Sequence, residues 1–341
     1  MRLGLTVPYS GRMPIPTLRR LVEAADGLGY DTVWAPEVYG ADAFTVLADL
    51  GARTRRIRLG TGIANIFART PAMLAQSAAS LDLLSEGRVV LGLGTSGHQV
   101  VEWWHGEPFD RSLRRLRETI EIVRMILRRD RLEYEGEVFH LHGGLRLILH
   151  PYRTEIPIYL ASVTPGGLEL TGELADGWLP IFVSPRHFEA TFRPALERGA
   201  RKSGRALDDL RVCAYQQVVV DDDVARARDL ARSHLALYIG GMGSRRKNYY
   251  NELFCRYGFE GEARRIQDLY LEGHRKDAMA AIPDALVDLV TVCGPLDRCR
   301  EGLQERAAAG IDELALQLEV AGDESAALQA LEGLRPELVG G

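Results

Sequence analysis

The segment 88–106, RVVLGLGTSGHQVVEWWHG, combines an apolar strand with residue types that can hold an anionic ligand. The strand runs into three closely spaced glycines: Gly92, Gly94 and Gly97. Glycine lets a backbone turn sharply and approach a ligand closely. Thr95 and Ser96 add hydroxyl groups, and the N–H groups exposed by such a turn suit phosphate oxygens. The segment therefore predicts a phosphate-binding turn at the end of a strand.

Titratable and aromatic side chains follow this turn directly: His98, Glu102, Trp103, Trp104 and His105. A glycine turn followed by such residues is typical of the mouth of a cofactor site. The tryptophans can equally be packing residues, and His105 can equally be a structural histidine.

The spacing of the three glycines also fits G-x-G-x-x-G, the dinucleotide-binding pattern. That pattern needs a helix opening directly from the turn, and an acidic residue about 20 positions further on at the end of a second strand. The acidic residues near that distance, Glu118 and Glu121, fall inside an amphipathic helical pattern. This argues against a Rossmann site, and a glycine-rich corner without a ligand is the other alternative.

A second glycine turn follows the apolar strand 156–161. It spans residues 162–167, SVTPGG, and leads into a helix expected at 168–175. The N-terminus of a helix attracts anions through its free N–H groups and its dipole. The sequence thus offers two separate anion-binding turns.

The composition is that of an ordinary globular protein, with 341 residues, 46% hydrophobic, 26% charged and a formal net charge of −5. This charge gives no support for nucleic-acid binding, and the arginines of 124–131 alternate with apolar residues at helical spacing. No apolar run is long enough to span a bilayer, and the N-terminus lacks the apolar stretch of a signal peptide. We therefore expect a cytoplasmic protein that acts on a small molecule, with neither a nucleic acid nor a membrane as partner.

Residue types that bind metals are present without the spacing of a metal site. Four cysteines occur, none in a C-x-x-C pair: Cys213, Cys255, Cys293 and Cys299. We interpret them as reduced thiols, as is usual in the cytoplasm. His140 and His142 alternate along a predicted hairpin, but no third ligand is evident, so we expect no metal site.

Eight strand–helix units can be followed along the chain, and they predict an α/β fold with a (β/α)8 TIM barrel. The expected strands are 3–7, 30–35, 57–63, 88–94, 156–161, 176–180, 210–220 and 313–318. We expect one domain, 1–341, with a hairpin insertion near 130–150 and a helical insertion near 240–285. In such a barrel the glycine turns lie together, because the carboxyl ends of parallel strands meet at one end.

Several segments carry a resemblance to a known family: GYDTVWAPEVYGADAF (29–44), the stretch from Ile57 to Gly97, WHGEPF (104–109), IPIYLASVTPGGLELTGELADGW (156–178) and YIGGMGSRRKNYYNELFCRYGF (238–259). They resemble the luciferase-like monooxygenase superfamily, and within it the deazaflavin (coenzyme F420)-dependent oxidoreductases. The resemblance implies a bacterial luciferase-like barrel with the deazaflavin ring at the carboxyl ends of the strands.

The resemblance also implies roles for particular residues. A non-prolyl cis peptide is common after the third strand, and here it would be Gly62–Ile63. The implied phosphate contacts are Thr95, Ser96, Gly97, His98, Ser162, Gly166 and Gly167. Ala161, Gly177 and Trp178 would line the same wall, and Glu37 would lie near the ring or the substrate.

The chain departs from the sugar-phosphate dehydrogenases of the superfamily at two positions. Their histidine after the acidic residue of the second strand is Val38 here, and their glutamate in the glycine turn aligns with Gly97. The proton donor is therefore open, with His98, Glu102 and His105 as candidates beside Glu37.

Three functions are compatible with these features. The first is hydride transfer between coenzyme F420 and a small organic substrate. The second is an FMN-dependent monooxygenase that uses reduced flavin and oxygen. The third is a cofactor-binding relative without turnover. The resemblance further implies a homodimer.

Overall fold

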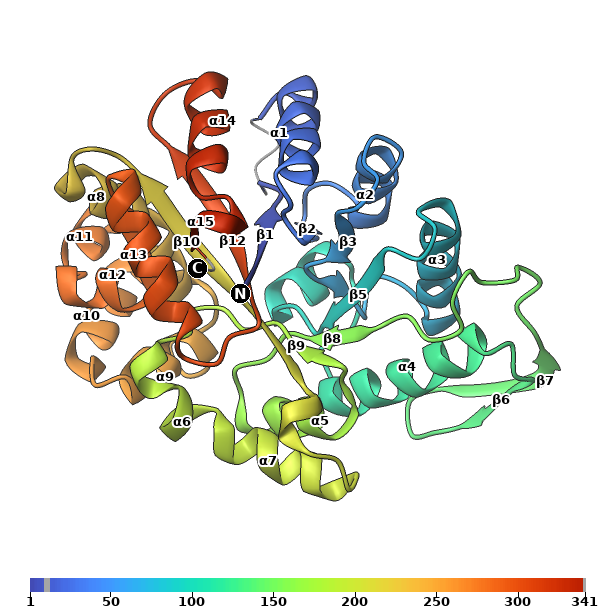
Figure 1. Cartoon of the computed structure of the whole chain (residues 1–341). Helices are drawn as coiled ribbons and strands as arrows, with labels where there is room; N and C mark the ends of the chain where they lie inside the picture. The colour runs from blue at the N-terminus through green and yellow to red at the C-terminus, as the bar shows by residue number, and fades with distance from the viewer. Residues whose placement is uncertain (9–12, 340–341) are drawn as a thin grey trace.

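Eight parallel strands form a closed barrel in the computed structural model, which describes residues 1–8 and 13–339 (Figure 1). The barrel strands are β1 (Arg2–Thr6), β2 (Thr32–Ala35), β3 (Arg58–Thr61), β5 (Val89–Gly94), β8 (Ile158–Leu160), β9 (Gly177–Trp178), β10 (Arg211–Val220) and β12 (Glu313–Val320). The barrel closes because β12 pairs with both β1 and β10, and β10 pairs with β9. The predicted (β/α)8 barrel is confirmed.

Side chains of alternate strand residues fill the barrel interior, as the two-residue period of a strand requires. The interior core consists of Trp34, Val90, Tyr159, Leu179, Cys213 and Ala315. Trp34 lies so close to Gly60 that any side chain at position 60 would overlap its ring. At the amino-terminal end of the barrel, Glu313 accepts hydrogen bonds from the Trp34 indole (3.0 Å) and from Arg58 (2.9 Å).

Helices surround the barrel and cover its outer face (Figure 1). They are α1 (Ile15–Gly27), α2 (Ala43–Gly51), α3 (Pro71–Leu84), α4 (Ser112–Leu127), α5 (Pro165–Leu174), α6 (Phe188–Thr191), α7 (Arg193–Lys202), α8 (Val224–Ala236), α13 (Leu296–Ala307), α14 (Glu324–Gly333) and α15 (Pro336–Val339). Side-chain caps begin several of them; Thr70, for example, accepts the Met73 N–H directly before Pro71 at the start of α3.

Two short strands, one hairpin and a group of helices stand outside the eight-unit pattern. Strand β4 (Ala64–Asn65) pairs with β5, and β11 (Thr291–Gly294) pairs with the carboxyl half of β10. The hairpin of β6 (Leu132–Glu135) and β7 (His140–Leu145) projects at the right of Figure 1. The helices α9 (Tyr249–Arg256), α10 (Glu260–Leu271), α11 (Arg275–Ala280) and α12 (Asp284–Val290) gather on the opposite side.

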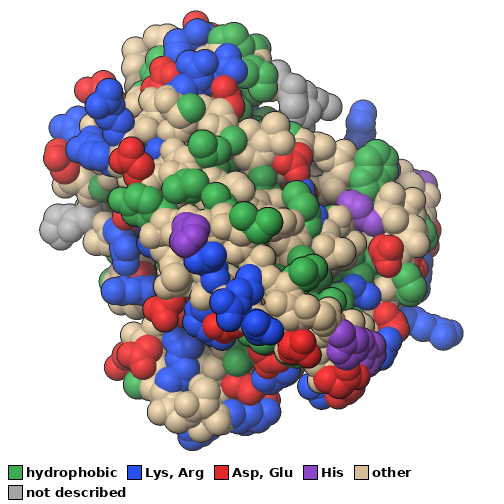
Figure 2. Space-filling view, turned by 90° about the vertical axis from the view of Figure 1, so that its right-hand side faces the viewer, with side chains coloured by type: hydrophobic (Ala, Val, Ile, Leu, Met, Phe, Trp, Pro, Cys, Tyr) green, Lys and Arg blue, Asp and Glu red, His purple; other side chains and the backbone are tan. Residues whose placement is uncertain are grey.

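Charged side chains of both signs are interspersed on the face shown in Figure 2, with hydrophobic side chains scattered between them. Within residues 1–8 and 13–339, none of the helices has the length and apolar character needed to cross a membrane.

Candidate cofactor and substrate site

The third barrel strand ends at a cis peptide bond between Gly62 and Ile63, as the family resemblance implies. The Tyr215 hydroxyl, from β10 on another side of the barrel, donates a hydrogen bond to the Gly62 carbonyl at 3.0 Å. The Ile63 side chain lies over Gly94 of β5. Residues of β3, β5 and β10 therefore meet at the carboxyl end of the barrel.

Three partly exposed side chains cover the barrel core at this end: Ile63, Ala161 and Tyr215. All three pack on the interior core beneath them. Apolar, partly exposed residues on a rigid barrel end form a surface on which a flat ring can lie. We refer to these three residues as the ring floor.

The turn after β5 begins with Thr95 and Ser96, whose side chains are partly exposed. Ser96 adopts a positive φ of 56°, a backbone conformation that non-glycine residues rarely adopt outside special turns and sites. Gly97 is exposed, and a Cβ there would meet no atom of the described residues within 4 Å. The open space beside this backbone fits a phosphate group.

The turn after β8 lies beside it, because β5 and β8 are neighbours and the Ala161 N–H bonds to the Leu93 carbonyl at 3.0 Å. Thr164 caps α5 by accepting the Gly167 N–H at 3.3 Å. A Cβ on Gly167 would lie 1.9 Å from Ser162 Oγ, so this close approach requires glycine. Gly166 is exposed at the helix start. The two predicted anion-binding turns thus lie on adjacent strands.

Glu37 follows β2, and its carboxylate forms an ion pair with Arg69. Arg69 donates to both Glu37 oxygens, at 2.6 and 2.7 Å, and also contacts Asp42. The backbone N–H groups of Ala43 and Asn65 point to the same carboxylate at 3.4 and 3.3 Å. With its lone pairs engaged in this way, Glu37 is better suited to organising the loops than to exchanging protons.

The other three predicted catalytic residues lie on the loop after the β5 turn. Glu102 is exposed, whereas His98 is partly exposed and packs edge-on against Trp103 with centroids 6.3 Å apart. Within the described residues, Nε2 of His105 is buried and has no hydrogen-bond partner. Trp104 is exposed and approaches Tyr39 of the β2 loop. Of these three residues, His105 is the one with a buried polar atom that the described residues leave without a hydrogen bond.

The structure corrects the expectation for Gly177 and Trp178. Trp178 is fully buried and packs against Phe188 and Phe192, at centroid distances of 6.0 and 5.0 Å, on the outer side of the barrel. Gly177 lies against the Tyr159 ring inside the barrel core. Neither residue lines the carboxyl end, but the Trp178 indole donates to the Ser162 carbonyl at 2.8 Å and so supports the second turn.

A set of polar residues on the interior face was missed by the sequence analysis: Thr6, Gln217, Gln317 and Glu319. They continue the alternation of interior residues such as Cys213 and Ala315 beyond the apolar core, at the carboxyl ends of their strands. The sequence does carry a signal for three of them: Gln217, Gln317 and Glu319 fall at alternate positions of strands 211–220 and 313–320, on the face that points into the barrel. Burial raises the pKa of Glu319, although the hydrogen bond from Gln217 opposes this.

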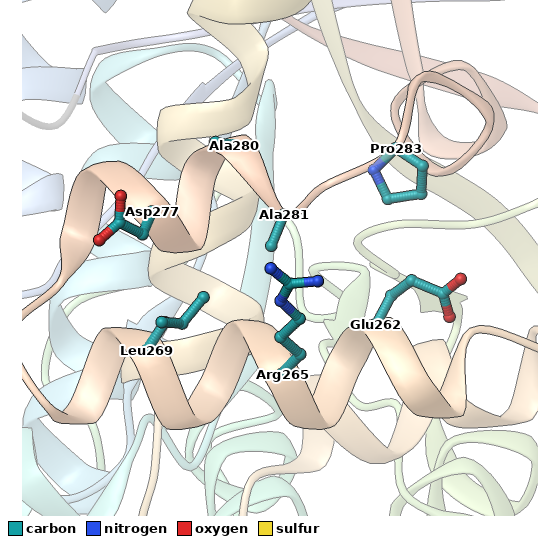
Figure 3. Close-up of a pocket in the computed structure, with 7 residues that line it drawn as sticks. All are labelled: Glu262, Arg265, Leu269, Asp277, Ala280, Ala281 and Pro283. Atoms are coloured by element: carbon teal, nitrogen blue, oxygen red, sulfur yellow. The ribbon is translucent and has the colours of Figure 1, made fainter.

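A hollow of about 580 Å³ lies away from the barrel, between α10 and α11. Figure 3 shows Arg265 pointing between these helices towards Ala281, while the carboxylates of Glu262 and Asp277 point away from it. No group of three or more metal-ligating side chains occurs among the described residues that could hold an ion. This hollow shows none of the features of the barrel end.

The fold is that of an α/β-barrel enzyme, a class that holds its active sites at the carboxyl ends of the barrel strands. The chain belongs to the luciferase-like monooxygenase family, whose model matches residues 1–313. It is therefore an oxidoreductase.

Known proteins extend this comparison. A Mycobacterium tuberculosis protein named as a coenzyme F420-dependent oxidoreductase is 40% identical over 324 residues, 91% of this chain and 93% of the relative. A coenzyme F420-dependent tetrahydromethanopterin reductase from Methanopyrus kandleri has a similar structure, with a TM-score of 0.83, 23% identity and coverage of 98% and 97% of the two chains. An F420-dependent secondary alcohol dehydrogenase, solved with an F420–acetone adduct, has a TM-score of 0.80, 18% identity and 99% coverage of both chains. These two structural likenesses show the fold.

Proposed function

We propose that the protein transfers a hydride between coenzyme F420 and a small organic substrate. The observation that carries this proposal is the 40% identity, across nearly the whole chain, to a relative named as F420-dependent. The geometry supports it, because two glycine turns on adjacent strands border a flat apolar floor. A tricyclic ring with a phosphate tail matches that combination of surfaces.

The residues of the chain divide into two roles in this proposal. Ile63 and Ala161 would support the ring, while Ser96, Gly97 and the start of α5 at Gly166 would hold the phosphate through N–H and hydroxyl groups. The bound deazaflavin supplies the hydride chemistry, and the protein supplies binding, orientation and exclusion of water. FMN shares the ring shape and the phosphate, so it is the second cofactor to test.

Titration of the purified protein with oxidised F420, reduced F420 and FMN tests the proposal. We expect saturable F420 binding at micromolar concentrations and weaker binding of FMN. Gly167→Ala should weaken F420 binding about tenfold or more, since its Cβ would overlap Ser162. Gly27→Ala is the matched control, because a Cβ there meets no atom within 4 Å. A wild-type protein that binds no F420 would contradict the proposal; preference for FMN with oxygen consumption would favour the monooxygenase.

We further propose that the protein forms a homodimer, as the family resemblance implies. Several large apolar side chains are exposed, including Leu84, Ile148 and Tyr152. Such exposed side chains are compatible with an interface between copies. Light scattering on the purified protein should give twice the mass of one chain, and a monomer at all concentrations tested would refute this.

A further inference from the structure

A row of polar side chains crosses three adjacent strands on the interior face of the barrel. Gln217 of β10 and Gln317 of β12 are direct partners in the parallel register. Leu5 pairs with Leu316, so the register places Thr6 of β1 beside Gln317. Polar side chains in a barrel interior are expensive unless a partner satisfies them, and this row therefore calls for an explanation.

Two members of the row are buried, and each has one polar atom without a hydrogen-bond partner in the described part of the chain. Thr6 and Gln217 are each only 5% exposed. The Thr6 hydroxyl and the Gln217 Oε1 atom have no hydrogen bond from the described residues. A buried acceptor without a donor costs about 1–3 kcal/mol. A ligand hydroxyl group at this row would satisfy both atoms, because its oxygen can accept from the Thr6 hydroxyl and its O–H can donate to Gln217 Oε1.

Glu319 lies two residues beyond Gln317 on the same face of β12. Its Oε1 accepts a hydrogen bond from Gln217 Nε2 at 3.0 Å, and the residue is only partly exposed. Among the described residues no cation forms an ion pair with it, so nothing compensates the burial of a charge. Burial raises the pKa of Glu319 above its usual value. The carboxyl group is thereby suited to hold a proton at a pH where most glutamates have lost theirs.

The neighbouring charged groups are engaged elsewhere. Asp221, directly after β10, is paired with Arg226. Asp323 caps the start of α14, and Glu324 in that helix is paired with Arg20. On the interior face of β10 the next titratable group is Tyr215, whose hydroxyl donates to Gly62. Among the residues that the structure describes, Glu319 is therefore the carboxyl group available to a ligand on this side of the barrel.

The polar row and the ring floor occupy opposite halves of the barrel end. In sheet order, β3, β5 and β8 carry the floor and the two anion-binding turns, whereas β10, β12 and β1 carry the row. Tyr215 joins the halves, because it lies two residues before Gln217 on the same face. A substrate that contacted the row would lie beside a ring resting on the floor.

We propose that Glu319 is the proton donor and acceptor of the reaction, and that the substrate is a carbonyl compound or the corresponding alcohol. This inference rests on the proposed function. In the reducing direction the carbonyl carbon accepts a hydride from the reduced deazaflavin, which is oxidised. The π electron pair moves to the oxygen, which takes the proton of Glu319. The product is an alcohol, and the Glu319 carboxylate regains its proton from water.

The role of Gln217 is to position this carboxyl group. Its amide N–H holds Glu319, and its Oε1 is free to accept a hydrogen bond from the substrate hydroxyl. A site built to hydrogen-bond a substrate oxygen rejects analogues that lack it. By contrast, the predicted donors His98, Glu102 and His105 lie on the loop after β5 rather than on the interior face.

Kinetics with a panel of ketones and secondary alcohols of graded size test the inference. For the best substrate, Glu319→Gln should lower kcat about 10²–10⁴-fold and leave F420 affinity within about threefold of the wild type. In wild type, carbonyl reduction should slow as the pH rises through the Glu319 pKa, and alcohol oxidation should accelerate. This dependence of the two rates on pH, which we call the Glu319 limb, should vanish in Glu319→Gln. Gln217→Leu should move this pH dependence to higher pH. The hydrogen bond from Gln217 lowers the Glu319 pKa, so its removal should raise that pKa.

Infrared titration of the cofactor-free protein gives a readout that does not depend on turnover. Wild type should show a protonated carboxyl band that titrates above the usual glutamate range and that Glu319→Gln removes. Glu301→Gln, on the exposed face of α13, is the matched control and should keep the band and the kinetics.

The possible failures can be told apart. A wild type that binds no deazaflavin overturns the proposed function and this inference together. Normal F420 binding with turnover of no panel member overturns the substrate class. Normal binding with unchanged kcat and pH profile in Glu319→Gln, or loss of the limb in His105→Asn instead, overturns the role of Glu319.

Discussion

At the scale of single residues, Glu37 has an arginine partner that its place in the sequence does not reveal. Its position after the second strand follows from the order of elements, and the sequence analysis put it near the ligand for that reason. The structure adds Arg69, 32 positions later, with two short hydrogen bonds to a carboxylate that is only 8% exposed. No local pattern in the sequence links these two residues, because their contact depends on the barrel.

We expect Arg69→Met to lower the free energy of unfolding by about 2–3 kcal/mol, because it leaves the Glu37 carboxylate buried without its cation. The double variant Arg69→Met with Glu37→Gln should recover part of this loss, since a neutral amide is less costly to bury. Urea unfolding of the wild type and both variants provides the measurement. Equal loss in the single and double variants would mean that the ion pair is not the source of the effect.

At the scale of elements, the hairpin of β6 and β7 depends on one carboxylate of α4. Glu118 is 2% exposed and accepts the backbone N–H groups of Glu137, Val138 and Phe139 at 2.8 to 3.0 Å. A side chain at position 136 would overlap it, which explains the glycine there. The acidic residue that failed to fit a dinucleotide site thus organises the hairpin turn.

Replacing Glu118 should loosen this hairpin. Burial alone would raise the pKa of Glu118, but the three backbone N–H groups outweigh it and hold the pKa below its usual value. A depressed folded-state pKa means that this stabilisation is present at neutral pH and disappears as the pH falls through that pKa. We expect Glu118→Ala to lower the free energy of unfolding by about 1–3 kcal/mol at pH 7, and less at acidic pH.

Hydrogen exchange of the amides at 137–139 locates the effect, since these amides should exchange faster in Glu118→Ala. Glu121→Gln is the matched control on the same helix, because Glu121 accepts its bond from the Tyr134 hydroxyl rather than from the backbone of the turn. Unchanged exchange at 137–139 in Glu118→Ala would show that the turn holds without the carboxylate.

At the scale of the whole molecule, the alternation of strands and helices was sufficient to predict the barrel, because eight parallel units have few other ways to close. The short strand β11 was not predicted, because it pairs only with the carboxyl half of β10, beyond where that strand leaves β9. Trp178 was assigned to the wrong wall because a strand of two residues carries no period that separates its inner from its outer face. The two glycine turns could be predicted from the spacing of their glycines. The polar row could not, because its members come from three strands, β1, β10 and β12, that only the barrel brings side by side.

The attachment of the inserted helices to the barrel gives the last prediction. His234 of α8 packs against Phe182, which follows β9, and against Tyr238, with centroids 5.8 and 4.7 Å apart. Phe254 of α9 contacts the same Phe182 ring at 5.5 Å, so this aromatic cluster joins barrel and insertion. Burial lowers the pKa of His234 to about 4.

Because the folded-state pKa lies below the ordinary histidine value of about 6.5, folding favours the neutral ring. The resulting stability is complete above pH 6.5 and declines as the pH falls towards 4. His234 retains some exposure, so we expect a loss of about 1–2 kcal/mol rather than the full value. His234→Phe should remove this part of the acid sensitivity while keeping the packing. Urea unfolding at several pH values between 4 and 7 measures it, and an identical pH dependence in wild type and variant would assign the acid sensitivity to other groups.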